Sequence, residues 1–353
     1  MRESINNIFN KAKTHISAIF FICGFLFDLI TLNRIDQGLM LIQQALFLAL
    51  ILIFLHIEIK VKLGGKVPAT IAKYRVYILH FLFGALLSAF AIFYFLSSSG
   101  LNSLLFVLAI IALMFANELP QFQKLNIPFK VALFSVCLIS YLSYLTPTIL
   151  GFLGAGPLML SGIIFFLLMT LNSVFLQKVT DDNKFINKNF TTPSLITLAV
   201  FLGLYFLKVI PPVPLSIKKI GIYRGLEKAD GKYILSHKKH PLKFWQSGEK
   251  NYRYQEGDKI YCFAGIFSPT NFSDQVKFNW FLETKNGWLL SDEVPIKISG
   301  GRDKGFRAYS YKSNIQAGNW RVKVLTKDLR EIGRINFTVT NGISDNELQT
   351  EIY

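Results

Sequence analysis

Long apolar stretches dominate the first 210 residues of the chain. Seven such runs can be read, and they cover roughly residues 16–32, 38–57, 75–97, 101–117, 129–149, 157–177 and 194–210. A helix of roughly 20 apolar residues crosses the hydrocarbon layer of a bilayer, which is about 30 Å thick. The pattern therefore predicts an α-helical multi-pass membrane domain of about seven spans over residues 1–210.

The pattern changes beyond residue 216, where apolar and polar residues alternate in short runs. Six runs read as strands, at residues 259–267, 275–283, 294–300, 305–313, 319–326 and 332–340. Turn residues separate them, which is typical of an antiparallel, all-β sandwich of immunoglobulin-like type. We expect this domain over residues 220–342, followed by a polar tail over 343–353. Its large core side chains are expected from Trp280, Trp320 and Phe337.

Three prolines separate the two patterns. Pro211 and Pro212 end the last apolar run, because proline cannot continue a helix, and Pro214 follows shortly after. Closely spaced prolines favour a stiff, extended backbone. We therefore expect residues 211–219 to form a rigid, proline-rich linker where the chain leaves the membrane.

Composition supports this division. Hydrophobic residues make up 52% of the chain, and its mean hydropathy is +0.38. Residues 1–214 hold 15 Lys and Arg and 7 Asp and Glu, whereas residues 215–353 hold 23 and 15. The first part is poor in charge, as a membrane domain must be. The net charge of +16 is scattered and comes with no nucleic-acid-binding motif, so the lipid bilayer is the expected partner and nucleic acid is not.

The basic residues between the apolar runs predict an orientation. With the amino terminus inside the cell, thirteen Lys and Arg fall on the cytoplasmic side, against Arg34 and Lys208 on the other side. Cytoplasmic loops of membrane proteins carry such an excess. Since the number of runs is odd, we expect a protein of the inner membrane with a cytoplasmic amino terminus and a periplasmic carboxyl-terminal domain.

No motif in the chain predicts a cofactor, a metal or a catalytic centre. Of the three cysteines, only Cys262 lies in the β part, so that part cannot form an internal disulfide. The spacing of Cys and His does not match a zinc site. His237 and His240 are expected in a solvated loop, because no acidic partner is fixed near them.

Ionisable residues in or near the apolar runs are candidates for an intramembrane polar site. Asp28 lies within the first run, His80 lies about one turn inside the third, and Glu118 ends the fourth. Together with His56 and Glu58, the last two could serve a metal or a proton relay near the inner face. The alternative is that these groups are interfacial residues at helix ends, where charge costs little.

Aromatic and cationic residues in the β part are candidates for ligand binding. Alternation places Arg307, Tyr309 and Tyr311 on one face of a strand, and Trp288 is a further candidate. Such a face could bind a glycan or another protein. The alternative is that this face packs inward, with Arg307 at its rim.

Four motifs in the β part resemble a known family. They are the strand of Trp280, the Arg-x-x-Ser strand of Arg307 and Ser310, the Gly-x-Trp-x-Val strand of Gly318, Trp320 and Val322, and the Gly-x-x-x-Phe-x-Val strand of Gly333, Phe337 and Val339. In order and spacing they resemble the bacterial domain of unknown function 2914. Family members with membrane helices are also similar at residues 210–225, but Phe278 stands where they often have His. The resemblance covers roughly residues 210–340 and implies no known activity.

The sequence thus predicts a multi-pass membrane protein with an extracytoplasmic β-sandwich. The leading hypothesis is a non-catalytic binding or scaffolding module for an envelope protein or glycan. Two alternatives stay open: a small-molecule or ion transporter with an accessory sandwich, and an intramembrane enzyme that uses the region of His80 and Glu118.

Overall fold

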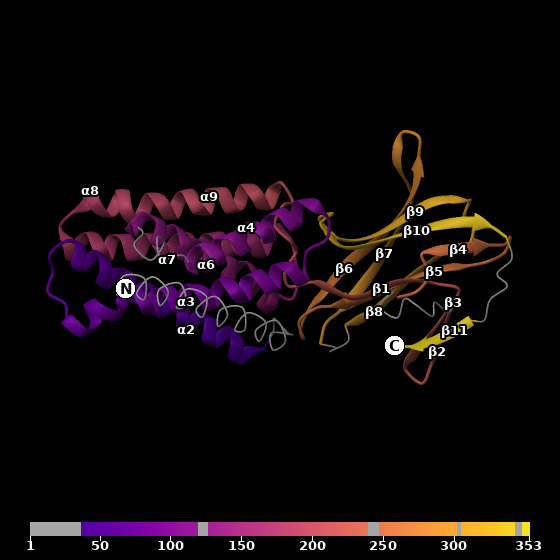
Figure 1. Cartoon of the computed structure of the whole chain (residues 1–353), viewed down its shortest axis with the longest axis horizontal. Coiled ribbons are helices and arrows are strands. Elements are labelled where there is room, and N and C mark those ends of the chain that lie inside the picture. Colours follow the sequence, from indigo (N-terminus) through magenta and orange to yellow (C-terminus); the bar gives the residue numbers. More distant parts are fainter. Residues whose placement is uncertain (1–36, 119–125, 239–246, 302–304, 343–347) are drawn as a thin grey trace, which may run out of the picture. The chain divides into compact units, whose positions relative to one another are not determined.

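The structure is a computed structural model that describes residues 37–118, 126–238, 247–301, 305–342 and 348–353 (Figure 1). The chain divides into two compact units. One contains the described residues up to Phe95, with Leu105–Leu145 and Met159–Leu207, and the other contains Leu96–Leu104, Thr146–Leu158 and Lys208–Tyr353. The first unit is helical and the second is mainly β, which confirms the order of an apolar helical part followed by a β domain.

The helical part consists of long apolar helices. Their bounds are α2 Gly38–Lys62, α3 Ala69–Leu96, α4 Leu101–Glu118, α6 Ile127–Leu150, α7 Ala155–Thr180, α8 Asn183–Ile186 and α9 Thr192–Phe206, with a π-helical turn at Asn187–Thr191. Among the described residues, the segments long and apolar enough to cross a membrane are Gly38–Lys62, Lys73–Leu96, Ile127–Leu150, Ala155–Thr180 and Asn183–Phe206. Leu101–Asn117 is apolar but shorter. The predicted run at 16–32 lies outside the described residues.

The last of these helical segments begins earlier than the apolar run at 194–210 predicts. Asp182 caps its start by accepting a hydrogen bond from the backbone N–H of Phe185 (2.9 Å). Pro193 has no N–H to donate, and the π-helical turn Asn187–Thr191 ends two residues before it. The polar residues of that turn hide the beginning of the helix from a hydropathy pattern.

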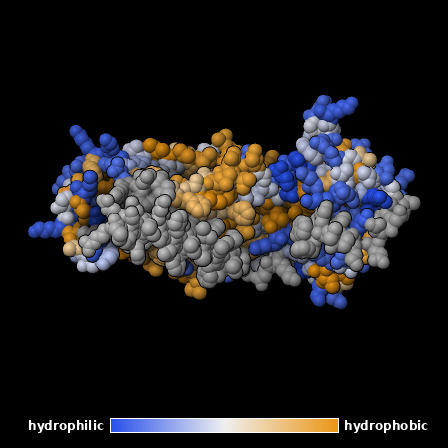
Figure 2. Space-filling view, viewed as in Figure 1, coloured by the Kyte–Doolittle hydropathy of each residue, from blue (hydrophilic) through white to orange (hydrophobic). Residues whose placement is uncertain are grey.

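Apolar side chains gather on the surface of the described helices (Figure 2). Leu39, Ile42 and Phe175, for example, each expose more than half of their surface. In water, exposed apolar surface of this extent would promote association. Helices that are apolar on their outer faces as well as in their contacts are typical of proteins in lipid.

The β part forms three sheets within the described residues. The strands are β1 Ser216–Tyr223, β2 Gly225–Ala229, β3 Lys232–Lys238, β4 Asn251–Tyr254, β5 Ile260–Phe267, β6 Ser273–Thr284, β7 Gly287–Ser299, β8 Phe306–Lys312, β9 Gly318–Thr326, β10 Glu331–Asn341 and β11 Leu348–Ile352. The sheet orders are β1-β5-β8, β4-β10-β9-β6-β7 and β11-β3-β2. All six predicted strands are present.

The first two sheets enclose one hydrophobic core, so they form a sandwich. Trp280 of β6 is fully buried, and its indole Nε1–H donates to Ser310 Oγ of β8 (2.7 Å). The Trp280 ring meets the ring of Phe337 edge-on at 6.1 Å. Trp320 is also buried in this core, and its Nε1–H donates to the Gln316 carbonyl (2.9 Å). Each buried indole thus keeps a hydrogen-bond partner.

The third sheet covers part of the outer face of the first sheet. Tyr223 of β1, Leu235 of β3 and Phe263 of β5 are fully buried in a small cluster of their own. Its strand β11 lies within the segment for which a polar tail was predicted, and it pairs with β3. The outer face of the first sheet is therefore only partly open to solvent.

Two loops between helices belong to the β unit. In the loop after α3, Ser99 Oγ donates to Glu331 Oε1 of β10 (2.6 Å). In the loop after α6, the Gly151 carbonyl accepts from the Ser273 N–H (2.7 Å), and Leu153 N–H donates to Asp274 Oδ2 (2.9 Å). The β unit is thus built from three separate stretches of chain.

The proline-rich segment is buried and turned, where the sequence predicts an extended linker. Pro211, Pro212 and Pro214 are all buried, and the Val213-Pro214 peptide bond is cis. The Val213 N–H donates to the Pro211 carbonyl (2.9 Å) and the Leu215 N–H to the Pro212 carbonyl (3.0 Å). Packing of these residues inside the β unit overrides the intrinsic preference of proline for an extended chain.

Candidate ligand-binding surface

The outward face of β8 carries the predicted ligand-binding residues. Ala308 and Ser310 are buried in the sandwich, so alternation turns Arg307, Tyr309 and Tyr311 to the outer face of the sheet. Tyr309 is 40% exposed and Tyr311 is 54% exposed. Of the two interpretations that the sequence leaves open for this face, inward packing does not occur.

The neighbouring strand extends this face into a row of tyrosines. Tyr311 lies opposite Tyr261 of β5 in the strand register, and their ring centroids are 5.8 Å apart. Tyr309 lies opposite Phe263, and its ring centroid is 6.1 Å from that of Tyr233 on β3. We call Tyr261, Tyr309 and Tyr311 the tyrosine row.

Cationic groups frame the tyrosine row. The Arg307 guanidinium lies 5.7 Å from the ring centroid of Tyr233 and donates to the Gly231 carbonyl in the β2–β3 turn. The Lys259 ammonium lies 5.5 Å from the ring centroid of Tyr311. Both distances allow cation–π attraction, which holds the side chains in place beside the rings.

An ion pair at the end of β8 links this strand to β7 of the other sheet. Lys312 Nζ binds Asp292 Oδ2 and donates to Ser291 Oγ (3.1 Å). Burial acts to raise the pKa of Asp292, but hydrogen bonds from Lys312 and Ser291 and the Lys312 charge outweigh it and lower the pKa. The carboxylate is therefore ionised at neutral pH and pairs with Lys312 between the two sheets.

The structure places Trp288 away from the tyrosine row. Trp288 lies on β7, in the other sheet of the sandwich, where the Arg321 guanidinium stacks over its ring at 3.9 Å. Arg321 Nε donates to Asn336 Oδ1 (2.8 Å). Burial, followed by the charge of Arg334, lowers the pKa of Arg321. The four candidate residues therefore form two separate surfaces.

The predicted intramembrane residues are only partly described. Asp28 lies outside the described residues, and Glu118 is the last residue of α4. His80 is half-buried in α3, and its backbone carbonyl accepts a hydrogen bond from Asn117 Nδ2 of α4 (3.0 Å). This contact brings the carboxyl-terminal turn of α4 next to His80.

A buried ion pair in the helical unit was not predicted. Lys130 Nζ of α6 lies 2.6 Å from Glu58 Oε1 of α2, and both side chains are less than 15% exposed. His56 stacks on Phe175 of α7, with ring centroids 5.8 Å apart. Across the described ranges, no three His, Cys, Asp or Glu side chains gather in a group that could hold a metal ion.

A family model matches the part of the chain that contains these strands. Residues 273–339 match the family described as "Protein of unknown function (DUF2914)". The chain carries a DUF2914 domain. The match confirms the resemblance and runs from the start of β6 into β10. The DUF2914 match therefore includes Trp288, Tyr309 and Tyr311, whereas Tyr261 precedes it.

Solved structures similar to this chain share little sequence with it. An immunoglobulin-like protein from Pseudomonas aeruginosa is 12% identical, with a TM-score of 0.23, over 36% of this chain and 98% of that chain. A β-glucosidase from Listeria innocua in complex with gluconolactone is 10% identical, with a TM-score of 0.21, over 32% of this chain and 17% of that chain. No curated protein matches the chain.

Proposed function

We propose that this is a multi-pass protein of the inner membrane that presents its β-sandwich in the periplasm as a non-catalytic module for binding an envelope glycan. The five apolar segments among the described residues, the shorter helix α4 and the apolar run at 16–32 supply about seven spans. The excess of basic residues in alternate loops supports a cytoplasmic amino terminus.

The make-up of the β unit supports this topology. Leu96–Leu104, Thr146–Leu158 and the chain from Lys208 onward share one compact unit, so they must lie on the same side of a membrane. The positive-inside pattern assigns all three to the outer side. The compact unit supports a common side for the three stretches, and the basic residues alone favour the outer side.

The tyrosine row is the observation that carries the binding role. Two rings of an edge strand, Tyr309 and Tyr311, stay substantially exposed, whereas Tyr223 and Phe263 of the neighbouring aromatic cluster are fully buried. The face of an aromatic ring carries partial negative charge and attracts the C–H groups of a sugar ring. Phenol hydroxyls and the nearby cations can hydrogen-bond sugar hydroxyls.

A glycan fits this surface better than a folded protein does. A standard protein interface takes about 800 Å² from each partner, with an apolar centre. Here the third sheet covers the neighbouring part of the face, and the face ends at β8, the edge strand of its sheet. What is left is a narrow aromatic strip with polar edges, which suits a linear sugar chain.

The binding role can be tested with the full-length protein in detergent. We expect the double variant Tyr309→Ala/Tyr311→Ala to lose at least about tenfold in affinity for peptidoglycan fragments, because two aromatic contacts are removed. Binding is measured by pull-down on isolated sacculi and by calorimetry with soluble fragments.

Trp288→Ala is the matched control, since it removes an aromatic side chain from the other sheet of the same domain. Retained binding in this variant and loss in the double tyrosine variant support the proposal. Equal binding by wild type and the double tyrosine variant contradicts it. If the tyrosine row binds an envelope protein and no glycan, the glycan assignment is wrong.

A further inference from the structure

A polar cavity inside the β unit is independent of the tyrosine row. It measures about 330 Å³ and is lined by the loop Ser99–Ser103, by the segment around Lys208 and Pro211, and by β9 and β10 with the turn between them. Ligand sites in proteins begin at about this size. The whole lining belongs to one compact unit.

The cavity lining is strongly cationic. Four basic side chains contribute to it, namely Lys208, Lys323, Arg330 and Arg334, against one carboxylate, that of Glu331. Asp328, which binds Arg330 Nε at 2.7 Å, lies beside the lining and leaves an excess of positive charge. Such a concentration of cations attracts an anion, and arginine suits phosphate because its planar fork offers several donors.

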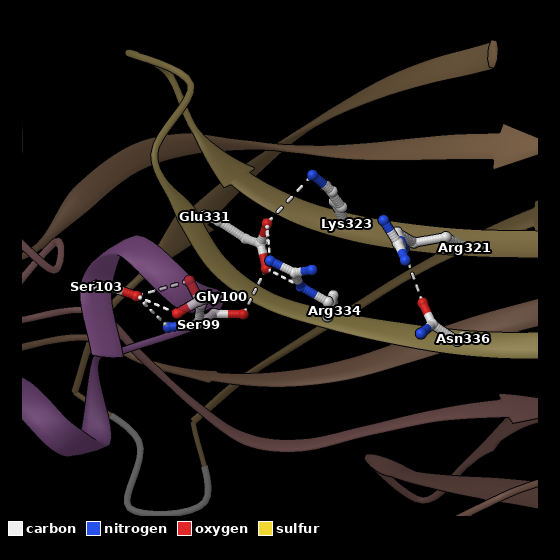
Figure 3. A network of polar contacts seen from close by, with 8 residues as sticks. All are labelled: Ser99, Gly100, Ser103, Arg321, Lys323, Glu331, Arg334 and Asn336. Atoms are coloured by element: carbon white, nitrogen blue, oxygen red, sulfur yellow. Dashed lines mark hydrogen bonds and ion pairs between the residues drawn. The ribbon is translucent and has the colours of Figure 1, made fainter. Parts of the chain in front are cut away.

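The cations are held in place by the structure. Glu331 binds Arg334 through both carboxylate oxygens, at 2.5 and 3.0 Å, and lies 3.4 Å from Lys323 Nζ (Figure 3). The Arg330 guanidinium is 6% exposed and donates to the Ile210 carbonyl (3.2 Å). The positions of Arg330, Arg334 and Lys323 are thus set before any ligand enters, which lowers the entropic cost of binding.

The stretch Ser99–Ser103 lines one side of the cavity with serine hydroxyl groups, and its backbone lies close to Arg334. Ser103 Oγ donates to the Ser99 carbonyl (2.7 Å) and accepts from the Ser99 N–H (3.0 Å), so the loop is closed on itself. Gly100 has a φ of +86°, and a side chain there would collide with the Arg334 guanidinium. Glycine therefore lets Arg334 lie directly on the loop.

The place of these residues in the chain indicates the source of the anion. The stretch Ser99–Ser103 includes the loop between two apolar helices and the first turn of the second, since α3 ends at Leu96 and α4 begins at Leu101. Lys208 follows the end of α9 at Phe206 by two residues. If the helices span a bilayer, all of these residues lie at the depth of the lipid headgroups.

We propose that this cavity binds a phosphoryl group, with the headgroup of an anionic phospholipid as its source. Lys208 and Arg334 are the residues that contact the phosphate, and Glu331 positions Arg334 and Lys323. The proposal rests on the membrane-spanning part of the proposed function and not on glycan binding.

The test uses full-length protein in a non-ionic detergent and native mass spectrometry. The probes are phosphatidylglycerol and a glucosyl diacylglycerol, which has similar tails and no phosphate. We expect preferential retention of phosphatidylglycerol, and about tenfold weaker retention in Lys208→Gln and in Arg334→Gln, because each loses a charged hydrogen-bond donor. Lys285→Gln, in the exposed β6–β7 turn, removes the same charge as Lys208→Gln and should bind as wild type does.

Added inorganic phosphate distinguishes the two sources of the group. Displacement of the lipid assigns recognition to the phosphoryl group alone, whereas retention assigns it to the headgroup together with its tails. Equal retention of the two lipids, or wild-type retention by Lys208→Gln, overturns the proposal. Lys208 is exposed, so we expect Lys208→Gln to leave the fold and the contacts of Glu331 unchanged. The Tyr309→Ala/Tyr311→Ala variant should keep its lipid, so failure of one proposal is separable from failure of the other.

Discussion

At the scale of single residues, the buried carboxylate of Glu249 joins the third sheet to the sandwich. It is fully buried and accepts hydrogen bonds from Arg224 Nε (2.8 Å) and Nη2 (3.0 Å), and from the Lys238 N–H at the end of β3 (2.7 Å). Arg224 also stacks over the ring of Tyr252 at 4.1 Å. A buried charge is tolerable here because every donor around it is used.

Glu249→Gln should therefore destabilise the β unit. A neutral amide cannot balance the buried Arg224 charge, and one of its ends is a donor that faces other donors, so we expect a loss of about 3 kcal/mol in the free energy of unfolding. Thermal unfolding of the full-length protein measures this loss. Glu293→Gln is the matched control, because its ion pair with Lys277 is exposed; an equal fall in melting temperature for both variants would contradict the interpretation.

Single residues also show where prediction from sequence ends. Lys130 counts as one of the thirteen cytoplasmic-side charges, yet it pairs with Glu58, which lies 72 positions earlier in the chain. Hydropathy gives the depth of each group and not the rotation of its helix, so this pairing cannot be read from the sequence. Tyr261 was missed for another reason: alternation in 259–267 places it on a face, but only the register with β8 sets it opposite Tyr311.

At the scale of elements, the start of β8 depends on one glycine. Gly305 precedes β8 with a φ of +84°, a conformation that side chains disfavour. A Cβ at this position would lie 2.7 Å from the backbone carbon of Ile266 on β5. The glycine thus allows β8 to enter the sheet next to β5 in the register that exposes Tyr309 and Tyr311.

Gly305→Ala should cost about 3 kcal/mol in the free energy of unfolding, since backbone strain and a collision with main-chain atoms add together. Gly231→Ala is the matched control: φ is +70° there, but no atom lies within 4 Å of the added carbon, so about 1 kcal/mol is expected. Chemical unfolding compares the two variants. Similar losses would mean that the contact with β5 does not restrain β8.

The sequence predicts well those elements whose apolar and polar residues follow a clear pattern. The six alternating runs are all strands, and the apolar runs among the described residues are helices. The strand β11 escapes prediction because it reads as a polar tail, and it forms by pairing with β3 and by placing the Tyr353 ring 4.9 Å from that of Phe263. The proline segment escapes for a similar reason, since tertiary burial decides its turns.

At the scale of the whole molecule, the orientation in the membrane is directly testable. We expect Lys285→Cys, in the β6–β7 turn, to react with a membrane-impermeant maleimide in intact spheroplasts, and Lys62→Cys, at the end of α2, to react only after permeabilisation. Both positions are exposed. Cys137 and Cys262 are buried and Cys23 is replaced by Ser in both variants, which limits background labelling. The reverse pattern of labelling would place the sandwich in the cytoplasm.

Sequence alone predicts the order of a helical part and a β part, because composition and period change together near residue 214. It does not predict that loops 96–104 and 146–158 are structural parts of the β unit. These loops carry no charge and no recognisable motif. Their role rests on single contacts, such as Ser99 with Glu331 and Gly151 with Ser273, that only the folded chain reveals.

This composite construction has a consequence for how the protein is made. The β unit needs hydrogen bonds from loops that are synthesised about 120 to 230 residues before the strands they meet. If the helices span a membrane as proposed, the β unit can complete its fold only after α3–α4 and α6–α7 have been inserted with both loops on the same side as the sandwich. A helix pair inserted the wrong way round would remove the loop contacts of Glu331, Ser273 and Asp274. In the proposed topology, folding of the sandwich would therefore depend on correct insertion of both helix pairs.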